Sequence, residues 1–262
     1  MKSHSHRRAF SLVELSIVLV ILGLLTGGIL AGQSLIHAAE LRAVTTEYQR
    51  YYTAGQAFRD KYFAVPGDFT NAQAFWGQST ACGGSSATGV CNGNGDNYVA
   101  GGSGVSTPAE MFMFWRELAL AGLIEGNFSG ISGAVGGTDT VPGTNSPKSK
   151  LSSAGWGVWT LGNYAGDGAT YKADYGNVLL GVGAYVSGSW PFAPAFKPED
   201  AWNIDTKMDD GKPGTGRVLP RDDEGFGGTN PCTTSTSNTD YSGSYNLSNT
   251  ALACGLHFVK AF

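Results

Sequence analysis

Residues 7–25 read RRAFSLVELSIVLVILGLL and join a basic pair to a long apolar run that contains one carboxylate, Glu14. Residues 15–36 carry no formal charge. As a helix that rises about 1.5 Å per residue, they span roughly 33 Å, close to the thickness of a bilayer core. An ionised acid at the centre of a membrane costs about 2.5–3.5 kcal/mol on insertion scales, and such residues are usually functional. The stretch therefore predicts a membrane helix in which Glu14 has a specific task.

The basic residues of this region, Lys2, Arg7 and Arg8, all precede the apolar run. Positive residues favour the cytoplasmic side of a membrane helix, so we expect a cytoplasmic N-terminus with the rest of the chain outside. Two simpler interpretations stay open at this point. A cleaved signal peptide has an apolar region of only about 7–15 residues and small residues at its cleavage site, whereas residues 29–31 are Ile-Leu-Ala. A plain membrane anchor explains the length of the run but not Glu14.

The segment RRAFSLVE, residues 7–14, resembles the cleavage and methylation signature of type IV prepilins and type II secretion pseudopilins. The resemblance implies that a membrane aspartic peptidase cuts between Ala9 and Phe10, and that Phe10 is then N-methylated. Counted from Phe10, Glu14 is the fifth residue, the position at which this family has a glutamate. The family prefers glycine before the cut, where this chain has Ala9.

The resemblance also implies a physical role for Glu14 in assembly. Cleavage leaves a positive amine on Phe10, and in a filament of packed apolar helices the amine of one subunit can meet Glu14 of another. Either charge alone is costly in apolar surroundings, and removing one partner of a buried pair typically costs about 3–5 kcal/mol. The implied function is a pilin-like structural subunit that polymerises through its N-terminal helix into a type IV pilus or a type II secretion pseudopilus.

Partners and location follow from the same resemblance. The expected partners are copies of the chain or other pilins, the prepilin peptidase and methyltransferase, and an inner-membrane assembly platform. The chain would be a single-pass inner-membrane protein with a periplasmic head, and would lie in a periplasmic or extracellular filament after assembly. The alternatives are a membrane-tethered or filament-tip binding module, such as an adhesin or minor pilin, and a plainly anchored periplasmic protein.

Composition and charge weigh against two other classes of protein. The whole chain has a formal charge of −4; without Lys2, Arg7 and Arg8 it has 14 basic and 21 acidic residues, or −7. Such an acidic chain argues against wrapping a nucleic acid by neutralising its phosphates. DNA uptake by a filament stays open. We find no Ser/His/Asp or Cys/His arrangement typical of a catalytic site and no phosphate-binding loop, so we expect neither an enzyme nor a required cofactor.

The apolar pattern continues beyond the membrane-length segment as one face of a helix. Apolar residues recur at steps of three and four at Leu41, Val44, Tyr48, Tyr51, Gly55, Phe58 and Tyr62. The opposite face is expected in solvent and carries Arg42, Glu47, Arg50 and Arg59. A coiled-coil seam is the alternative, but aromatic residues and a glycine suit packing against a sheet better.

This pattern divides the chain into four segments. They are a basic leader (1–9), a transmembrane and assembly half of the long helix (10–36), an amphipathic half (37–64) and a globular head (65–262). The head is predicted to be α+β, with a small antiparallel sheet and long loops packed against the long helix. The family resemblance implies the same pilin-like fold.

Shorter elements in the head can be placed from local signals. Helices are expected at residues 70–76, capped by Thr70, at 107–122, opened by a capping box of Thr107 and Glu110, and at 197–208, before a turn at 209–211. Strands are expected at 156–161, 178–186 and 254–262. Residues 129–150 have few apolar residues and predict an exposed loop.

The four cysteines are Cys82, Cys91, Cys232 and Cys254. They form no C-x-x-C pair and have no histidine at zinc-ligand spacing, so they indicate two disulfides and an oxidising compartment rather than a metal site. Four cysteines allow three pairings. Short loops favour Cys82–Cys91 and Cys232–Cys254, although the sequence alone leaves the other pairings open.

Two stretches have the oxygen-rich side chains that calcium prefers. The preferred candidate is Asp205, Asp209 and Asp210, because major pseudopilins as a family carry a structural calcium in a C-terminal loop. The second is Asn92, Asn94 and Asp96, which occupy alternate positions as in the start of a calcium loop but lack a glutamate at the twelfth position. Each has a structural alternative. For the first it is a helix end and turn in which Asp205 or Asp209 pairs with Lys207 or Lys212, and for the second it is an Asx-rich turn beside a disulfide.

Overall fold

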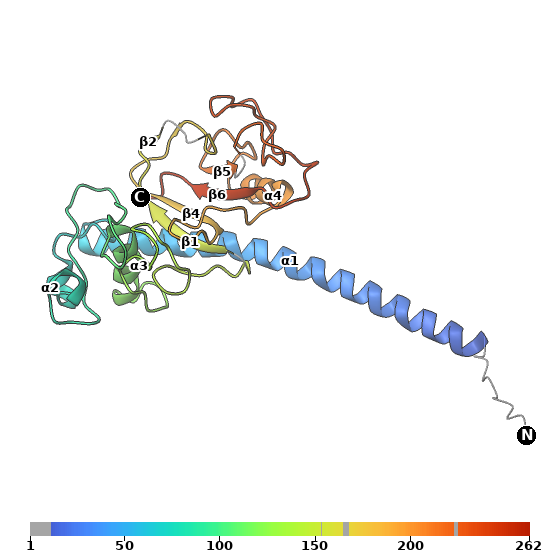
Figure 1. The fold of residues 1–262 in the computed structure, drawn as a ribbon, viewed down its shortest axis with the longest axis horizontal. Coiled ribbons are helices and arrows are strands. Elements are labelled where there is room, and N and C mark those ends of the chain that lie inside the picture. Colours follow the sequence, from blue (N-terminus) through green and yellow to red (C-terminus); the bar gives the residue numbers. More distant parts are fainter. Residues whose placement is uncertain (1–11, 153, 165–167, 223–224) are drawn as a thin grey trace, which may run out of the picture. The chain divides into compact units, whose positions relative to one another are not determined.

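The computed structural model describes residues 12–152, 154–164, 168–222 and 225–262. These residues form two compact units, one that ends at Glu40 and one that comprises Leu41–Phe262. Helix α1 (Leu12–Tyr62) contributes to both units (Figure 1). Ala9 and Phe10, the residues expected at the cleavage point, lie outside the described residues.

In the first unit, α1 presents apolar side chains on its surface. Leu12 and Leu35, for example, are 88% and 71% exposed. The hydroxyls of Ser16, Thr26 and Ser34 donate to main-chain carbonyl oxygens three or four residues earlier, at 2.8–2.9 Å. These bonds satisfy polar groups within the helix itself, as an apolar environment requires. Among the described residues, α1 is the helix long and apolar enough to cross a membrane, judged by length and composition.

The second unit is built on a four-stranded antiparallel sheet with the strand order β1-β4-β6-β5. The strands are β1 (Ala154–Trp159), β4 (Leu179–Ala184), β5 (Val218–Asp222) and β6 (Cys254–Phe258). A separate two-stranded ribbon consists of β2 (Asn163–Tyr164) and β3 (Ala173–Asp174). The predicted α+β class, with a long helix and a small antiparallel sheet, is confirmed.

Strand β5 is an element that the sequence does not indicate, because Pro220 lies at its centre. Proline cannot donate a hydrogen bond to a neighbouring strand, so it is found mainly on edge strands. In the structure β5 is an edge strand, and Pro220 lies opposite Leu256 of β6.

Glycines on one face of the sheet let other groups lie directly on it. A Cβ atom at Gly157 or Gly181 would come within 2.5 or 2.4 Å of the Trp159 ring. At Gly183 it would come within 2.7 Å of the carbonyl oxygen of Pro191. The glycines of β1 and β4 therefore seat the Trp159 indole and the Pro191 segment against what we call the outer face of the sheet.

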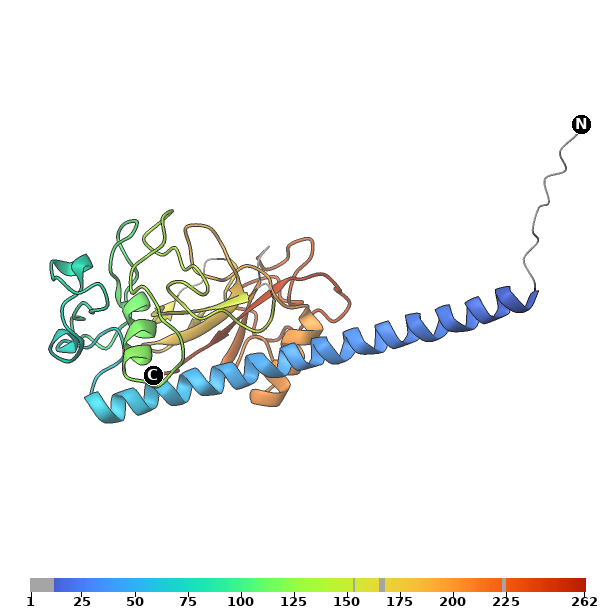
Figure 2. The ribbon, with the colours of Figure 1, turned by 90° about the horizontal axis from the view of Figure 1, so that it is seen from below.

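The other face, the inner face, packs against the second half of α1 (Figure 2). The Tyr51 ring meets Trp156 of β1 with centroids 5.3 Å apart, and the Tyr48 ring stacks on Phe258 of β6 at 4.2 Å. Gly55 leaves room for the C-terminal aromatic residue, because a Cβ there would lie 2.2 Å from the Phe262 ring. The aromatic face of α1 thus packs against its own sheet, as its composition predicts.

Glu47 corrects the expectation that its side of α1 faces solvent. It is only 8% exposed, since it lies between Val44 and Tyr51 at the border of the buried stripe. Its carboxylate accepts hydrogen bonds from Ser149 Oγ (2.7 Å), Lys150 N (2.8 Å) and Trp156 Nε1 (2.8 Å). This acid therefore ties the helix to β1 and to the loop before it.

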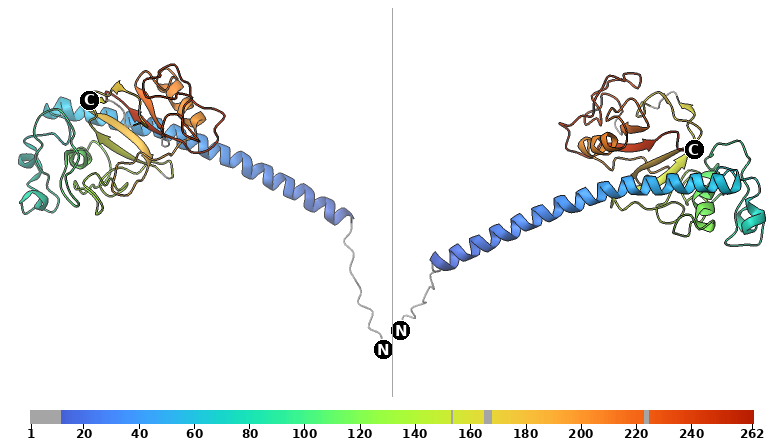
Figure 3. Two further views of the ribbon diagram at one scale, coloured as in Figure 1. Left: turned by 45° about the horizontal axis from the view of Figure 1, so that its top comes forward. Right: turned by 180° about the vertical axis from the view of Figure 1, so that it is seen from behind.

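The remaining helices are α2 (Ala72–Trp76), the 3₁₀ helix η1 (Thr80–Cys82), α3 (Glu110–Leu120) and α4 (Pro198–Met208). Helix α4 lies beside β5 and β6 (Figure 3). The α3 side chains expected in the core, Phe112, Trp115 and Leu118, are fully buried. Helix α1 ends at Tyr62 rather than 64, because Phe63 has a left-handed backbone (φ 55°).

Two predicted helix caps are wrong. Helix α2 begins after Asn71 rather than Thr70, and Asn92 from a distant loop accepts the hydrogen bond of the Gln73 N–H. Helix α3 begins at Glu110 without a capping box, since the Thr107 hydroxyl donates to Gly104. At α2 a loop far along the chain replaces the local cap, whereas at α3 the Thr107 hydroxyl bonds to a carbonyl oxygen three residues before it.

The prediction of an exposed loop at 129–150 is wrong in its burial. The segment has no helix or strand, but Asp139 and Asn145 are each 1% exposed. Asn145 donates to the carbonyl oxygens of Asp139 (2.8 Å) and Ile131 (3.1 Å) and accepts from Val141 N (2.7 Å). Polar side chains here satisfy the backbone, so a segment poor in apolar residues is nevertheless buried.

Two disulfides close short loops of the second unit. They join Cys82 to Cys91 and Cys232 to Cys254, with Cα–Cα distances of 5.9 and 5.2 Å. These are the pairs that the short loops favour. The second disulfide fixes the first residue of β6 to a loop that contains no regular element.

Glu117 of α3 is a second buried acid, and it is fully buried. Its Oε2 accepts the N–H of Gly67 at 2.7 Å, which holds the turn after α1 against α3. Its Oε1 has no hydrogen-bond partner among the described residues. Burial raises the pKa of Glu117 well above its usual value, and the nearby Asp68 and Glu110 carboxylates add to that rise.

This geometry predicts a pH-dependent contribution of Glu117 to stability. A carboxyl whose pKa is raised by folding holds its proton more tightly in the folded state, so its contribution is greatest at low pH and is lost as pH rises above the ordinary range of a glutamate. We expect Glu117→Gln to flatten the pH profile and to gain stability relative to the unsubstituted chain at alkaline pH. Urea unfolding midpoints measured from about pH 4, near the ordinary pKa of a glutamate, to about pH 9 check this expectation. The matched control is Glu125→Gln at an exposed position; identical profiles for Glu117→Gln and the unsubstituted chain would contradict the expectation.

Candidate functional sites

The first acidic group consists of Asp205, Asp209 and Asp210, at the C-terminal end of α4 and in the bend that follows. One carboxylate oxygen from each residue lies within 4.8 Å of the others. Asp205 is fully buried, Asp209 is half-buried and Asp210 is exposed. The three acids of the preferred calcium candidate therefore lie together.

Asp205 connects α4 to two other segments. Its Oδ2 accepts the Tyr245 hydroxyl at 2.9 Å and its Oδ1 accepts the Gly211 N–H at 3.2 Å. Burial raises the pKa of Asp205 to about 7 against the lowering effect of these two bonds, and the Asp210 and Asp209 carboxylates add to the rise. Negative charge in this group is therefore costly, a condition that a bound cation relieves.

Asp209 and Asp210 fold the loop that follows α4 around themselves. Asp209 Oδ2 accepts the N–H groups of Arg217 and Val218, the latter at 3.2 Å. Asp210 accepts the Lys212 N–H (2.9 Å) and the Thr215 hydroxyl (2.6 Å). Lys212 thus meets Asp210 through its backbone N–H.

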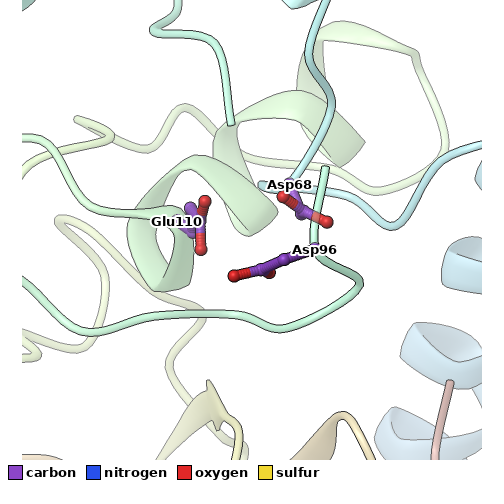
Figure 4. A group of neighbouring side chains, drawn as sticks. All are labelled: Asp68, Asp96 and Glu110. Carbon is purple, nitrogen blue, oxygen red and sulfur yellow. The ribbon is translucent and has the colours of Figure 1, made fainter. Parts of the chain in front are cut away.

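The second calcium candidate is rearranged by the fold. Asn92 turns away to α2, where its Oδ1 accepts the Gln73 N–H at 2.9 Å. Asp96 instead forms a group with Asp68 and Glu110, in which one oxygen of each lies within 4.8 Å of the others (Figure 4). Asn94 stays beside this group, since its Nδ2 donates to Asp96 Oδ2 at 2.9 Å.

The carboxylates of this second group hold the loop around residue 95. Asp68 is 2% exposed and accepts the N–H groups of Gly95 (2.5 Å) and Asn97 (2.7 Å). Glu110 accepts the N–H groups of Asn94 (3.2 Å) and Ala100 (2.9 Å). Burial raises the pKa of Glu110, and the charges of Asp68 and Asp96 add to that rise. Figure 4 shows the three side chains between the start of α3 and two loops.

Sequence reasoning misses Asp68 as a member of this group. It lies in the turn after α1, far along the chain from Asp96, and no local motif connects the two. Glu110 was assigned to a helix cap instead. The donor sets of both groups suit calcium, but their oxygens also bind backbone N–H groups, which gives each group a structural role of its own. Calcium at either group stays a prediction.

Glu14 lies in the first turn of α1, between the exposed apolar residues Val13 and Leu15. The positive end of the helix dipole favours an acid at this place. Most of the residues that follow it up to Ile36 are apolar, and the helix is long and apolar enough to cross a membrane, judged by length and composition.

Comparison with protein-family models finds the prokaryotic N-terminal methylation motif at residues 4–30. The chain carries the N-terminal signature of type IV pilins and pseudopilins. The matched range includes Ala9, Phe10 and Glu14, and the motif is that of pilin-like subunits processed by a prepilin peptidase, a structural class rather than a class of enzymes. Comparisons with curated proteins and with solved structures find no match.

The first acidic group yields a prediction about calcium. If Asp205, Asp209 and Asp210 bind the ion, calcium at about 100 times its Kd stabilises the fold by about 2.7 kcal/mol, because it binds the folded state. Melting curves of the full chain with calcium or with a chelator check this. The shift should shrink in Asp210→Asn and persist in Asp96→Asn, which changes the other group. Equal melting midpoints with calcium and with chelator would show that the site does not bind it.

Proposed function

We propose that this chain is a pilin-like subunit that is cut between Ala9 and Phe10, N-methylated at Phe10, and polymerised through its apolar helix. The filament is a type IV pilus or a type II secretion pseudopilus. The methylation motif at residues 4–30 carries this proposal. The exposed apolar surface of α1 up to Glu40 supports it, since such a surface needs a membrane or neighbouring helices to cover it.

The proposal places the N-terminus in the cytoplasm and the second unit outside the inner membrane. The position of Lys2, Arg7 and Arg8 before the apolar run supports this orientation. The two disulfides also support it, because such bonds persist in the periplasm and outside the cell rather than in the cytoplasm. A prepilin peptidase then acts at the cytoplasmic face, and an inner-membrane assembly platform extracts the processed chain.

Assembly brings the apolar helices of neighbouring copies together and removes Glu14 from water. The methylated amine of Phe10 in one copy neutralises the Glu14 carboxylate in the next, so that the two charges enter the bundle as a pair. Because the pair forms only at one longitudinal offset between helices, it selects the register of the filament. Glu14 acts as an assembly residue in this scheme.

Processing is tested by mass spectrometry of the mature chain. We expect the most N-terminal peptide to begin with Phe10 and to carry one added methyl group. A chain that retains Met1, or one that begins after Ala31, would contradict the proposal in favour of a plain anchor or a signal peptide. An Ala9→Gly variant, which restores the residue preferred by the family, should be processed at least as completely.

Assembly is tested by the substitution Glu14→Leu. It leaves the amine without its acid in an apolar bundle, a loss of about 3–5 kcal/mol for a buried pair, so filament yield should fall at least tenfold. Electron microscopy and shearing of filaments from the cell surface measure the yield, and mass spectrometry confirms that the variant is still processed. The control is Glu40→Gln, at the end of the same unit and outside the apolar run. Normal filaments from processed Glu14→Leu would exclude the pairing.

A further inference from the structure

Two cavities flank Trp190 on the outer face of the sheet. The larger, of about 280 Å³, lies between Trp190 and the segment that contains Tyr98. The smaller, of about 200 Å³, lies between Trp190 and the side chains of Arg221 and His257. Trp190 lines both cavities, so they are neighbours, and we call the pair the cleft and each cavity one of its compartments.

Aromatic rings form part of the wall of the larger compartment. Trp159 and Trp190 lie with ring centroids 4.5 Å apart and planes tilted by 50°. Trp159 is held in place by Gly157 and Gly181, which have no side chains to displace it. Tyr98 adds a third ring that is 44% exposed. A wall fixed in this way is formed before a ligand arrives, which lowers the entropic cost of binding.

Hydroxyl groups accompany the rings in both compartments. Thr138 and Thr160 line the larger one, and Thr170 and Ser189 line the smaller one. The Thr138 hydroxyl donates to the Gly188 carbonyl oxygen at 3.2 Å, which leaves its oxygen able to accept a hydrogen bond. Small polar groups spread along an aromatic wall suit a ligand that has polar groups around an apolar face.

The charge of the cleft differs from that of the chain. The chain without its leader has a formal charge of −7, yet none of the described residues that line either compartment is an acid. The formally charged group among them is Arg221, whose guanidinium lies 4.0 Å above the Phe192 ring. This composition disfavours a cation and suits a neutral or weakly acidic ligand.

We propose that this cleft binds a carbohydrate, with a pyranose ring stacked on Trp190. One face of a pyranose is a surface of C–H groups, which packs on an indole ring, while its hydroxyls can donate to an oxygen such as that of Thr138. Two compartments joined at Trp190 accommodate two linked sugar units. An acyl chain, by contrast, needs a longer aliphatic cavity. The cleft is formed by residues 98–257 and uses none of the apolar helix, so this role is separate from assembly.

The test uses the full chain in a membrane mimetic without sugar headgroups, because a glycoside detergent would compete. The probes are glucose, galactose, N-acetylglucosamine and their β1,4-linked disaccharides. Saturation-transfer NMR and calorimetry measure their binding. We expect at least one sugar to bind saturably with a Kd near the millimolar range, about −4 kcal/mol, and its disaccharide to bind more tightly. Trp190→Ala should weaken binding at least tenfold.

Matched variants separate loss of binding from loss of fold. Trp202→Ala removes a tryptophan of α4 that is 38% exposed and lies outside the cleft, and should leave binding unchanged. Tyr98→Ala alters an exposed wall residue and should weaken binding several-fold with an unchanged melting midpoint, which decides the matter if Trp190→Ala unfolds. N-acetyl-phenylalaninamide is the probe for an aromatic peptide. Each of three results would overturn the proposal. They are an absence of sugar binding, sugar binding that Tyr98→Ala and Trp190→Ala both leave intact, and binding of the phenylalanine amide alone.

Discussion

The buried side chain of Tyr51 connects helix α1, helix α3 and the four-stranded sheet of the second unit. Its ring meets Trp115 of α3 edge-on at 5.1 Å and Trp156 of β1 at 5.3 Å, and it is 1% exposed. Such edge-to-face pairs contribute about 0.5–1.5 kcal/mol beyond their area of burial. Because Trp156 also stacks on Phe258 of β6, the contact extends from the helix across the inner face of the sheet. The position of the sheet, and with it the glycine-lined outer face, follows from this packing.

The distribution of apolar residues around helix α1 changes along its length. Up to Glu40 its apolar residues cover all sides and lie exposed, whereas from Leu41 they are confined to the face that meets the sheet. A helix that is apolar all round needs lipid or other helices around it, while an amphipathic one needs a single packed partner. One continuous helix thereby contributes an apolar segment to the first unit and an amphipathic segment to the second.

Much of this fold can be predicted from periodicity, and its exceptions have a common cause. The steps of three and four from Val44 to Phe58 identify the buried face of α1 correctly, because they report a property of a single helix. The cap of α2, the burial of Glu47 and the grouping of Asp68 with Asp96 and Glu110 all depend on segments far along the chain. Local motifs cannot report such contacts. Strand β5 fails for a related reason: whether Pro220 is tolerable depends on its being at a sheet edge, which is a property of the whole sheet.

Glu47 and Glu117 are both buried acids, but their carboxylates accept different numbers of hydrogen bonds. Glu47 is buried and accepts three hydrogen bonds from three different donors, so its surroundings supply much of the solvation that water would give. Glu117 is buried with one such bond, to Gly67, and burial raises its pKa well above the usual value. Beyond its first turn, a membrane-length helix bonds each main-chain N–H to one of its own carbonyl oxygens, and apolar side chains offer no hydrogen-bond donors. In the bundle that we propose, an acid at position 14 is therefore best balanced by a full positive charge, which an N-terminus cut before Phe10 would supply from a neighbouring helix. The electrostatic rule that describes the buried acids of the head thus gives a physical reason for the proposed cleavage.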